Sequence, residues 1–140
     1  DETFAFFCKA ENLGLITPDW MRFEILGEPQ PICAGSELNY RIGLGPLPMR
    51  WRSVISRWSP PRGFVDNQTA GPYRLWWHEH TLEPNGDGTS MIDRVYYTPP
   101  FGPLGRLVHG LFIRRMLRAI FAYRAEASER LFGAARPSDA

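Results

Sequence analysis

Apolar and polar residues alternate along several segments in the first two-thirds of the chain. Alternation with a period of two is the pattern of a strand that buries one face and exposes the other. In residues 37–45, for example, Leu38, Tyr40 and Ile42 occupy the same face. The pattern predicts strands at 21–26, 37–45, 48–59, 73–84 and 89–99, with a shorter candidate at 64–68.

The segments between these runs predict how the strands connect. "NGDG" at 85–88 separates the last two runs, and its Asn and Gly residues tolerate the positive φ angles of a tight hairpin turn. "GPLP" at 45–48 is a second short turn. We therefore expect consecutive strands to pair antiparallel, as a meander.

The period changes near the end of the chain. Residues 111–132 contain no proline or glycine, and apolar residues recur there every three or four positions, which predicts a long amphipathic helix. Shorter helical segments are expected at 3–10 and just after Pro18. The apolar stripe of the long helix would be Leu111, Phe112, Met116, Ile120, Tyr123, Ala127 and Leu131. Its polar face would hold Arg114, Arg115, Arg118, Arg124 and Glu126.

A sheet with one apolar face must bury that face, and the long helix is the largest element able to cover it. We therefore predict an α+β fold with a single domain over residues 1–140. In this fold a curved antiparallel sheet wraps around a long C-terminal helix. A strongly curved sheet closed over one helix tends to leave a cavity between the two.

Composition narrows the function classes. Aromatic residues make up 14% of the chain, which favours a bulky core or an aromatic-lined cavity. The net charge of +1 gives no general attraction for nucleic acid, so we expect no nucleic-acid partner. No glycine-rich phosphate loop is present, and we expect no cofactor. No apolar run reaches the about 18 residues needed to span a bilayer.

Cys8 and Cys33 are expected to be free, buried thiols in a reducing cytoplasm.

Basic and apolar residues gather where the long helix begins. This basic apolar patch consists of Arg106, Arg114, Arg115 and Arg118 with Leu107, Phe112 and Ile113. One interpretation is transient contact with an anionic membrane. The other is an ordinary solvated helix face.

The segment "RLWWHEH" at 74–80 carries the most concentrated chemistry of the chain. On a strand, Trp76, His78 and His80 point the same way. If the "NGDG" turn is symmetric about residues 86–87, His80 lies opposite Asp93, and Trp76 lies near Tyr97. The sequence therefore predicts a carboxylate beside an imidazole on a mostly apolar wall.

Three interpretations of this segment compete. His78 and His80 have the spacing of metal ligands, but a catalytic zinc site needs a third protein ligand, and the remaining histidine, His109, lies in a distant elbow. We therefore expect no metal. His80 and Asp93 could act as a catalytic acid–base pair. Alternatively, these groups are polar anchors in an aromatic-lined binding pocket or hydrogen-bonded core residues.

The pocket interpretation has a defined set of residues. A guanidinium such as that of Arg52 could bind a carboxylate or phosphate, although Arg52 alternates with Trp51 and only one of them can face the cavity. The candidate ligand-binding residues are Tyr40, Trp51, Arg52, Trp76, His78, His80, Asp93 and Tyr97.

Several blocks of the sequence resemble a known superfamily. They include "FAFFCKAENLGLITPDWMRFEIL", "GSELNYRIGL", "FVDNQTAGPYRLW", "HEH" and "YYTPPFG". Together they are similar to a bacterial, polyketide cyclase/dehydrase-like branch of the START-related helix-grip superfamily (SRPBCC), over about residues 4–132. The resemblance implies a helix-grip fold with an internal hydrophobic pocket, but it implies no single activity, since members include carriers, cyclases and pure binders.

The chain departs from that family in one respect. Members begin with a strand before the "FAFF" helix, and this strand is missing from the given residues. Either the strand lies outside the given residues, or it is truly missing. If it is truly missing, a sheet edge is left open and could pair with a second copy as a homodimer. For function, the sequence favours binding of a small hydrophobic or amphipathic ligand. An aromatase/cyclase or dehydratase using His80 and Asp93 is the alternative.

Overall fold

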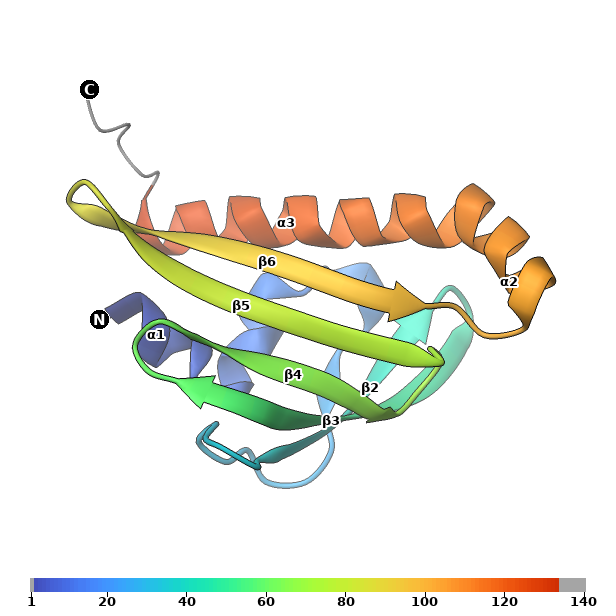
Figure 1. Ribbon diagram of the computed structural model, residues 1–140, viewed down its shortest axis with the longest axis horizontal. Helices are drawn as coiled ribbons and strands as arrows, with labels where there is room; N and C mark the ends of the chain where they lie inside the picture. Colours follow the sequence, from blue (N-terminus) through green and yellow to red (C-terminus); the bar gives the residue numbers. More distant parts are fainter. Residues whose placement is uncertain (1, 134–140) are drawn as a thin grey trace.

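The computed structural model describes residues 2–133. They form a six-stranded antiparallel sheet, with helical segments before and after it in the sequence (Figure 1). Each strand pairs with its neighbour in the sequence, so the predicted meander is confirmed. The strands are β1 (Glu24–Ile25), β2 (Glu37–Leu44), β3 (Leu47–Ser59), β4 (Gly63–Ala70), β5 (Leu75–Asn85) and β6 (Gly88–Thr98).

Helical segments precede and follow the sheet. The first are α1 (Glu2–Phe7) and the 3₁₀ segments η1 (Ala10–Ile16) and η2 (Asp19–Met21). The last are α2 (Gly102–Val108), the π-helical η3 (His109–Ile113) and α3 (Arg114–Phe132). In Figure 1, α3 runs along β5 and β6, and a ring contact of 5.6 Å between His78 and Phe121 joins the helix to the sheet. The chain therefore has the predicted α+β helix-grip fold.

The alternation of apolar residues correctly predicted the inward face of the long strands. In β5, Trp76, His78, His80 and Leu82 are all buried. The β5–β6 turn is centred on residues 86–87, and it places His80 opposite Asp93 as predicted. The short run at 64–68 is part of a full strand, β4. The prediction of a strand at 21–26 was largely wrong, because only Glu24–Ile25 pair with β2 and Met21 belongs to η2.

The predicted long helix needs two corrections. It starts earlier, since helical residues begin at Gly102, and its buried stripe is different. Leu111 and Phe112 are 62% and 68% exposed, whereas Leu117 is buried. The π-helical turn of η3 explains the difference, because a wider turn shifts the angular position of residues before it relative to those after it.

The first helix also differs from the expectation. It ends at Phe7 rather than residue 10, and the chain continues as the 3₁₀ turns of η1. Phe4 and Phe7 still reach the core, where they pack with Ile55 and Phe64. A second apolar cluster surrounds Trp51, on the part of the sheet that α3 covers with Leu117. Members of both clusters, among them Phe64 and Trp51, line one cavity together with residues of α3.

The basic apolar patch is largely exposed. Phe112 and Leu107 are 68% and 60% exposed, and the four arginines lie at the surface. Ile113 does not belong to the patch, because it packs against the cluster around Trp51. Whether the patch touches a membrane stays a prediction. None of the described helices is both long enough and apolar enough to cross a bilayer.

The two cysteines are free, but they are not both buried. Cys8 is half-buried against the core, where burial raises the pKa of its thiol. Cys33 is exposed, which corrects the prediction that its thiol is buried. It lies in the loop between β1 and β2, which follows the surface.

Gly63 permits the close approach of β4 to β5. Its φ angle is +145°, and an added Cβ would lie 1.9 Å from the backbone oxygen of His80. We expect Gly63→Ala to lower the free energy of unfolding by more than about 1 kcal/mol, because backbone must move in the strand that carries the site. Chemical denaturation measures the change. Gly88→Ala is the control, since its Cβ would meet nothing closer than 3.6 Å, and an equal loss in both variants would contradict the prediction.

Candidate functional site

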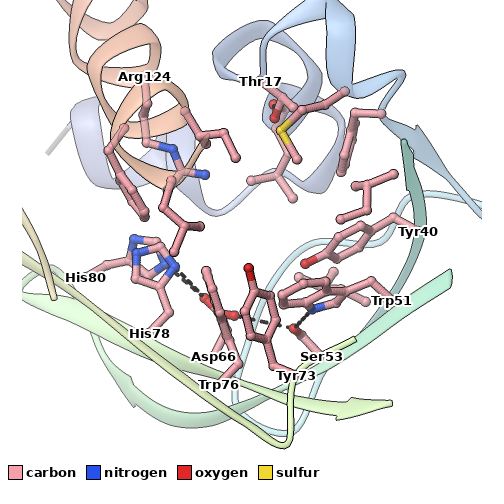
Figure 2. A pocket seen from close by; sticks show the side chains of 18 of the residues that line it. Thr17, Tyr40, Trp51, Ser53, Asp66, Tyr73, Trp76, His78, His80 and Arg124 are labelled. Carbon is pink, nitrogen blue, oxygen red and sulfur yellow. Dashed lines mark hydrogen bonds and ion pairs between the residues drawn. The ribbon is translucent and has the colours of Figure 1, made fainter. Parts of the chain in front are cut away.

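A cavity of about 130 Å³ lies between the inner face of the sheet and α3 (Figure 2). Its walls are mainly apolar, with Ile42 from β2 and Leu117 and Ile120 from α3. Aromatic rings from β2, β3 and β5 close one side, and a polar cluster occupies the other. The cavity therefore has an apolar part and a polar end, as ligand pockets commonly do.

The aromatic wall consists of four rings in mutual contact. Tyr40 stacks on Trp51 with centroids 5.9 Å apart, and Trp51 meets Trp76 edge-on at 5.0 Å. Tyr73 packs on Trp76 at 4.9 Å. Burial raises the pKa of Tyr40 above its usual range and that of Tyr73 to about 12. Both hydroxyls therefore stay neutral at physiological pH.

Two histidines and two aspartates form the polar cluster. His78 and His80 come from β5, Asp66 from β4 and Asp93 from β6. Asp66 Oδ2 lies 3.0 Å from His80 Nε2 and 3.4 Å from His78 Nδ1. Asp93 Oδ1 lies 3.0 Å from His78 Nε2 and 2.8 Å from His80 Nδ1, although the last pair lacks the alignment of a hydrogen bond. Each imidazole is therefore held between the same two carboxylates.

The cluster shifts the pKa values of its members. Burial by itself would raise the pKa of Asp66 and Asp93, but contacts with His78 and His80 outweigh it and leave both pKa values well below the usual range. Burial by itself would lower the pKa of His78, but the two carboxylates outweigh it and raise that pKa. Both aspartates are therefore ionised at neutral pH.

Asp66 also connects the cluster to the aromatic wall. The Ser53 hydroxyl donates to Asp66 Oδ1 at 3.3 Å, and the Trp51 indole N–H donates to Ser53 Oγ at 2.9 Å. Figure 2 shows this chain of contacts running from the histidines to Trp51. It satisfies polar groups that would otherwise be costly to bury.

Arg124 brings a positive charge to the same end of the cavity. It projects from α3 toward the histidines in Figure 2, and its Nη1 lies 3.9 Å from Asp93 Oδ1. Its buried Nε and Nη1 have no hydrogen-bond partner among the described residues. An anionic group of a ligand could fill that need.

The structure brings most of the predicted site residues together. Tyr40, Trp51, Trp76, His78 and His80 all line the cavity. Asp93 lies behind the histidines and borders a second groove, between the β5–β6 turn and α3. Tyr97 packs against Tyr73 and Trp76 outside the cavity lining, and its hydroxyl hydrogen-bonds His109.

The prediction for Arg52 was wrong. Its side chain is exposed on the outer face of β3, because its neighbour Trp51 takes the inward position. Arg124 was assigned to the polar face of the long helix, and that was also wrong. It follows Ile120 by four residues and precedes Ala127 by three, so helical spacing alone places it on the buried stripe.

Asp66 and Tyr73 were missed altogether. Asp66 lies in a short run whose apolar residues, Phe64 and Val65, are adjacent and both buried. Alternation therefore gave no indication of which face Asp66 occupies. Tyr73 lies just before β5 and reaches the cavity through the loop that follows β4.

Asp66 also removes the reason for excluding a metal. The sequence supplied only two histidines at ligand spacing. In the structure, Asp66, His78 and His80 each offer a ligand atom, and these atoms lie within 4.8 Å of one another. Asp66 thus offers the third protein ligand, which was not identified from the sequence.

Comparisons with known proteins support the fold. No model of a protein family matches the chain, and no functionally curated protein matches it either. Among solved structures, TTHA0849 from Thermus thermophilus is similar, with a TM-score of 0.56 and 13% sequence identity. The match covers 88% of this chain and 80% of TTHA0849. At this identity the likeness concerns the fold and carries no information on activity.

Proposed function

We propose that this chain is a member of the START-related helix-grip superfamily that binds a small hydrophobic or amphipathic ligand in the cavity. The observation that carries the proposal is an apolar, aromatic-walled cavity with a compact polar cluster at one end. An engineered apolar cavity of about 150 Å³ binds benzene, so about 130 Å³ suits a group of roughly one ring. A larger ligand would extend beyond this volume.

The polar end favours an amphipathic ligand. His78 and His80 reach the cavity from the sheet, and Arg124 reaches it from α3. These groups would orient a polar head while the apolar body lies against Trp51 and Trp76. A few placed polar groups on an otherwise apolar wall are typical of specific small-molecule sites.

The alternative is an enzyme of the aromatase/cyclase or dehydratase kind. It is favoured by one observation: His80 lines the cavity with the Asp93 carboxylate 2.8 Å behind its Nδ1. A carboxylate in that position supports an imidazole that exchanges a proton with a ligand. However, both aspartates contact both histidines, so His80 and Asp93 do not form an isolated pair. A His80→Ala variant that keeps ligand affinity but loses turnover would favour the enzyme.

Filling the cavity should weaken ligand binding. We expect Leu117→Trp to weaken binding of benzene at least about tenfold, because the indole would occupy the apolar space. Benzene titrations followed by NMR shifts of Trp51 and Trp76 measure the affinity. Native mass spectrometry of protein purified from cells would in addition reveal a natural ligand that co-purifies.

Leu111→Trp is the matched control, since Leu111 precedes α3 in the same helical run but is 62% exposed. It should bind benzene like the unmodified chain. Ile120→Phe fills the same cavity from a second position and should also weaken binding, which guards against a misfolded Leu117 variant. Absence of saturable shifts in the unmodified protein, or equal affinity in all variants, would refute the proposal.

A further inference from the structure

We propose that Asp66, His78 and His80 form a binding site for a divalent transition-metal ion, of which Zn²⁺ is the representative, open toward the cavity. The site joins one carboxylate oxygen and two imidazole nitrogens from the adjacent strands β4 and β5. Two histidines with one carboxylate are a ligand set that zinc and ferrous iron both accept. This proposal does not depend on the organic ligand proposed above.

The spacing of the ligand atoms fits a metal. Zinc lies about 2.0–2.2 Å from nitrogen and oxygen ligands, so two ligands at a tetrahedral angle are about 3.4 Å apart. Asp66 Oδ2 lies 3.4 Å from His78 Nδ1 and 3.0 Å from His80 Nε2. All three ligand atoms lie within 4.8 Å of one another, so small side-chain rotations could bring them onto one ion.

Asp93 supplies the outer support that metal-binding histidines usually have. The nitrogens that would not bind the metal both lie near Asp93 Oδ1. His78 Nε2 hydrogen-bonds it at 3.0 Å, and His80 Nδ1 lies 2.8 Å from it without hydrogen-bond alignment. An N–H directed at a carboxylate fixes the tautomer that leaves the opposite nitrogen free for a metal. Arg124 Nη1, 3.9 Å from the same oxygen, holds Asp93 in turn.

The closeness of the two rings also favours a metal. The imidazole centroids of His78 and His80 are 3.8 Å apart, and both side chains are buried. Two rings this close together can each direct one nitrogen at the same ion. A dication bound by two neutral rings would balance the charge of the nearby carboxylates. With neutral rings, the two carboxylates and Arg124 leave one negative charge for a dication.

The open side of the site faces the cavity. All three proposed ligands line it, whereas Asp93 lies behind them. Three protein ligands leave at least one coordination position, which a water molecule or a polar atom of a bound ligand would take. The metal would thus lie at the polar end of the cavity.

The test is a zinc titration of the folded protein after dialysis against a chelator. Isothermal titration calorimetry should give one Zn²⁺ per chain, with a dissociation constant in the micromolar range or tighter. Co²⁺ in place of Zn²⁺ should give the visible absorption of a four- or five-coordinate ion. Absence of stoichiometric binding in the unmodified chain would overturn the proposal and indicate that the histidines and carboxylates satisfy one another.

Variants assign the ligands. Asp66→Asn and His80→Gln should each weaken zinc binding by about 100-fold or more, and Asp93→Asn, which removes only the outer support, by about 10–100-fold. Glu79→Gln is the matched control, because Glu79 lies between the two histidines on β5 but pairs with Arg57 and Arg94 on the outer face. Unchanged affinity in Asp66→Asn would rule out this ligand set.

A ligand replacement covers the case in which a variant loses stability. His80→Cys keeps a metal ligand, and a thiolate bound to Co²⁺ adds an intense near-ultraviolet absorption that the unmodified chain, with Cys8 and Cys33 elsewhere, should lack. Folded His80→Cys protein that binds Co²⁺ without this band would contradict the assignment of His80.

Discussion

Trp76→Ala is expected to lower the free energy of unfolding by about 4 kcal/mol, because it removes the ring at the centre of the aromatic wall. Trp76 is buried and contacts Trp51, Tyr73 and Tyr97. Trp76 borders the cavity, so few side chains lie close enough to move into the space that its removal would create. Guanidinium denaturation followed by far-ultraviolet circular dichroism measures the change without relying on tryptophan emission.

Trp20→Ala is the matched control. Trp20 is 48% exposed in η2, so its removal should cost well under half as much. The affinity for benzene should also change in the Trp76 variant, because one wall of the cavity is gone. If the two variants lost equal stability, the aromatic wall would not be a tightly packed part of the core.

Asp66→Ala is expected to have the next largest effect, a loss of about 3 kcal/mol measured at pH 7 with a chelator present. Asp66 contacts both His78 and His80 and accepts a hydrogen bond from Ser53. Its removal leaves those buried polar groups without their shared acceptor, and an unsatisfied buried polar group is costly. Urea or guanidinium denaturation measures the loss.

Glu79→Ala provides the comparison. Glu79 also pairs with two cationic side chains, at 3.4 Å to Arg57 and 3.6 Å to Arg94, but both arginines are largely exposed. Pairs of that kind contribute less than about 1 kcal/mol, since water screens the charges. A loss in Asp66→Ala no greater than in Glu79→Ala would mean that the cluster is not the tightly coupled unit that its distances indicate.

The Trp76 and Asp66 predictions concern the two ends of the cavity, which differ in chemistry. The apolar end supports the proposed binding of a hydrophobic group, and the polar end supports orientation of a head group or, as inferred separately, a metal ion. Zinc titrations and benzene titrations use different probes, so either proposal can fail while the other stands. A chain that bound both would have a metal positioned beside a bound organic ligand.

The sequence predicted the sheet well because alternation is a local property. The "NGDG" turn fixed the pairing of β5 with β6, and that pairing alone placed His80 opposite Asp93. Alternation also put Trp51 inward, so naming Arg52 as a ligand-binding residue went against the local pattern, and the structure exposes Arg52. Periodicity failed at the start of the long helix, where a π-helical turn, which has no clear sequence pattern, changed the phase of the apolar stripe.

The sequence by itself determined the order of the strands, the inward face of β5 and the presence of a long covering helix, because these follow from spacing between neighbours along the chain. Only the tertiary structure decided that Asp66 and Arg124, 58 positions apart in the numbering, meet in the lining of the cavity that also holds the two histidines. Curvature of the sheet and the position of α3 set that meeting, and also the unfilled space beside it. Such long-range distances depend on how all the elements pack together, which no local pattern of residues specifies.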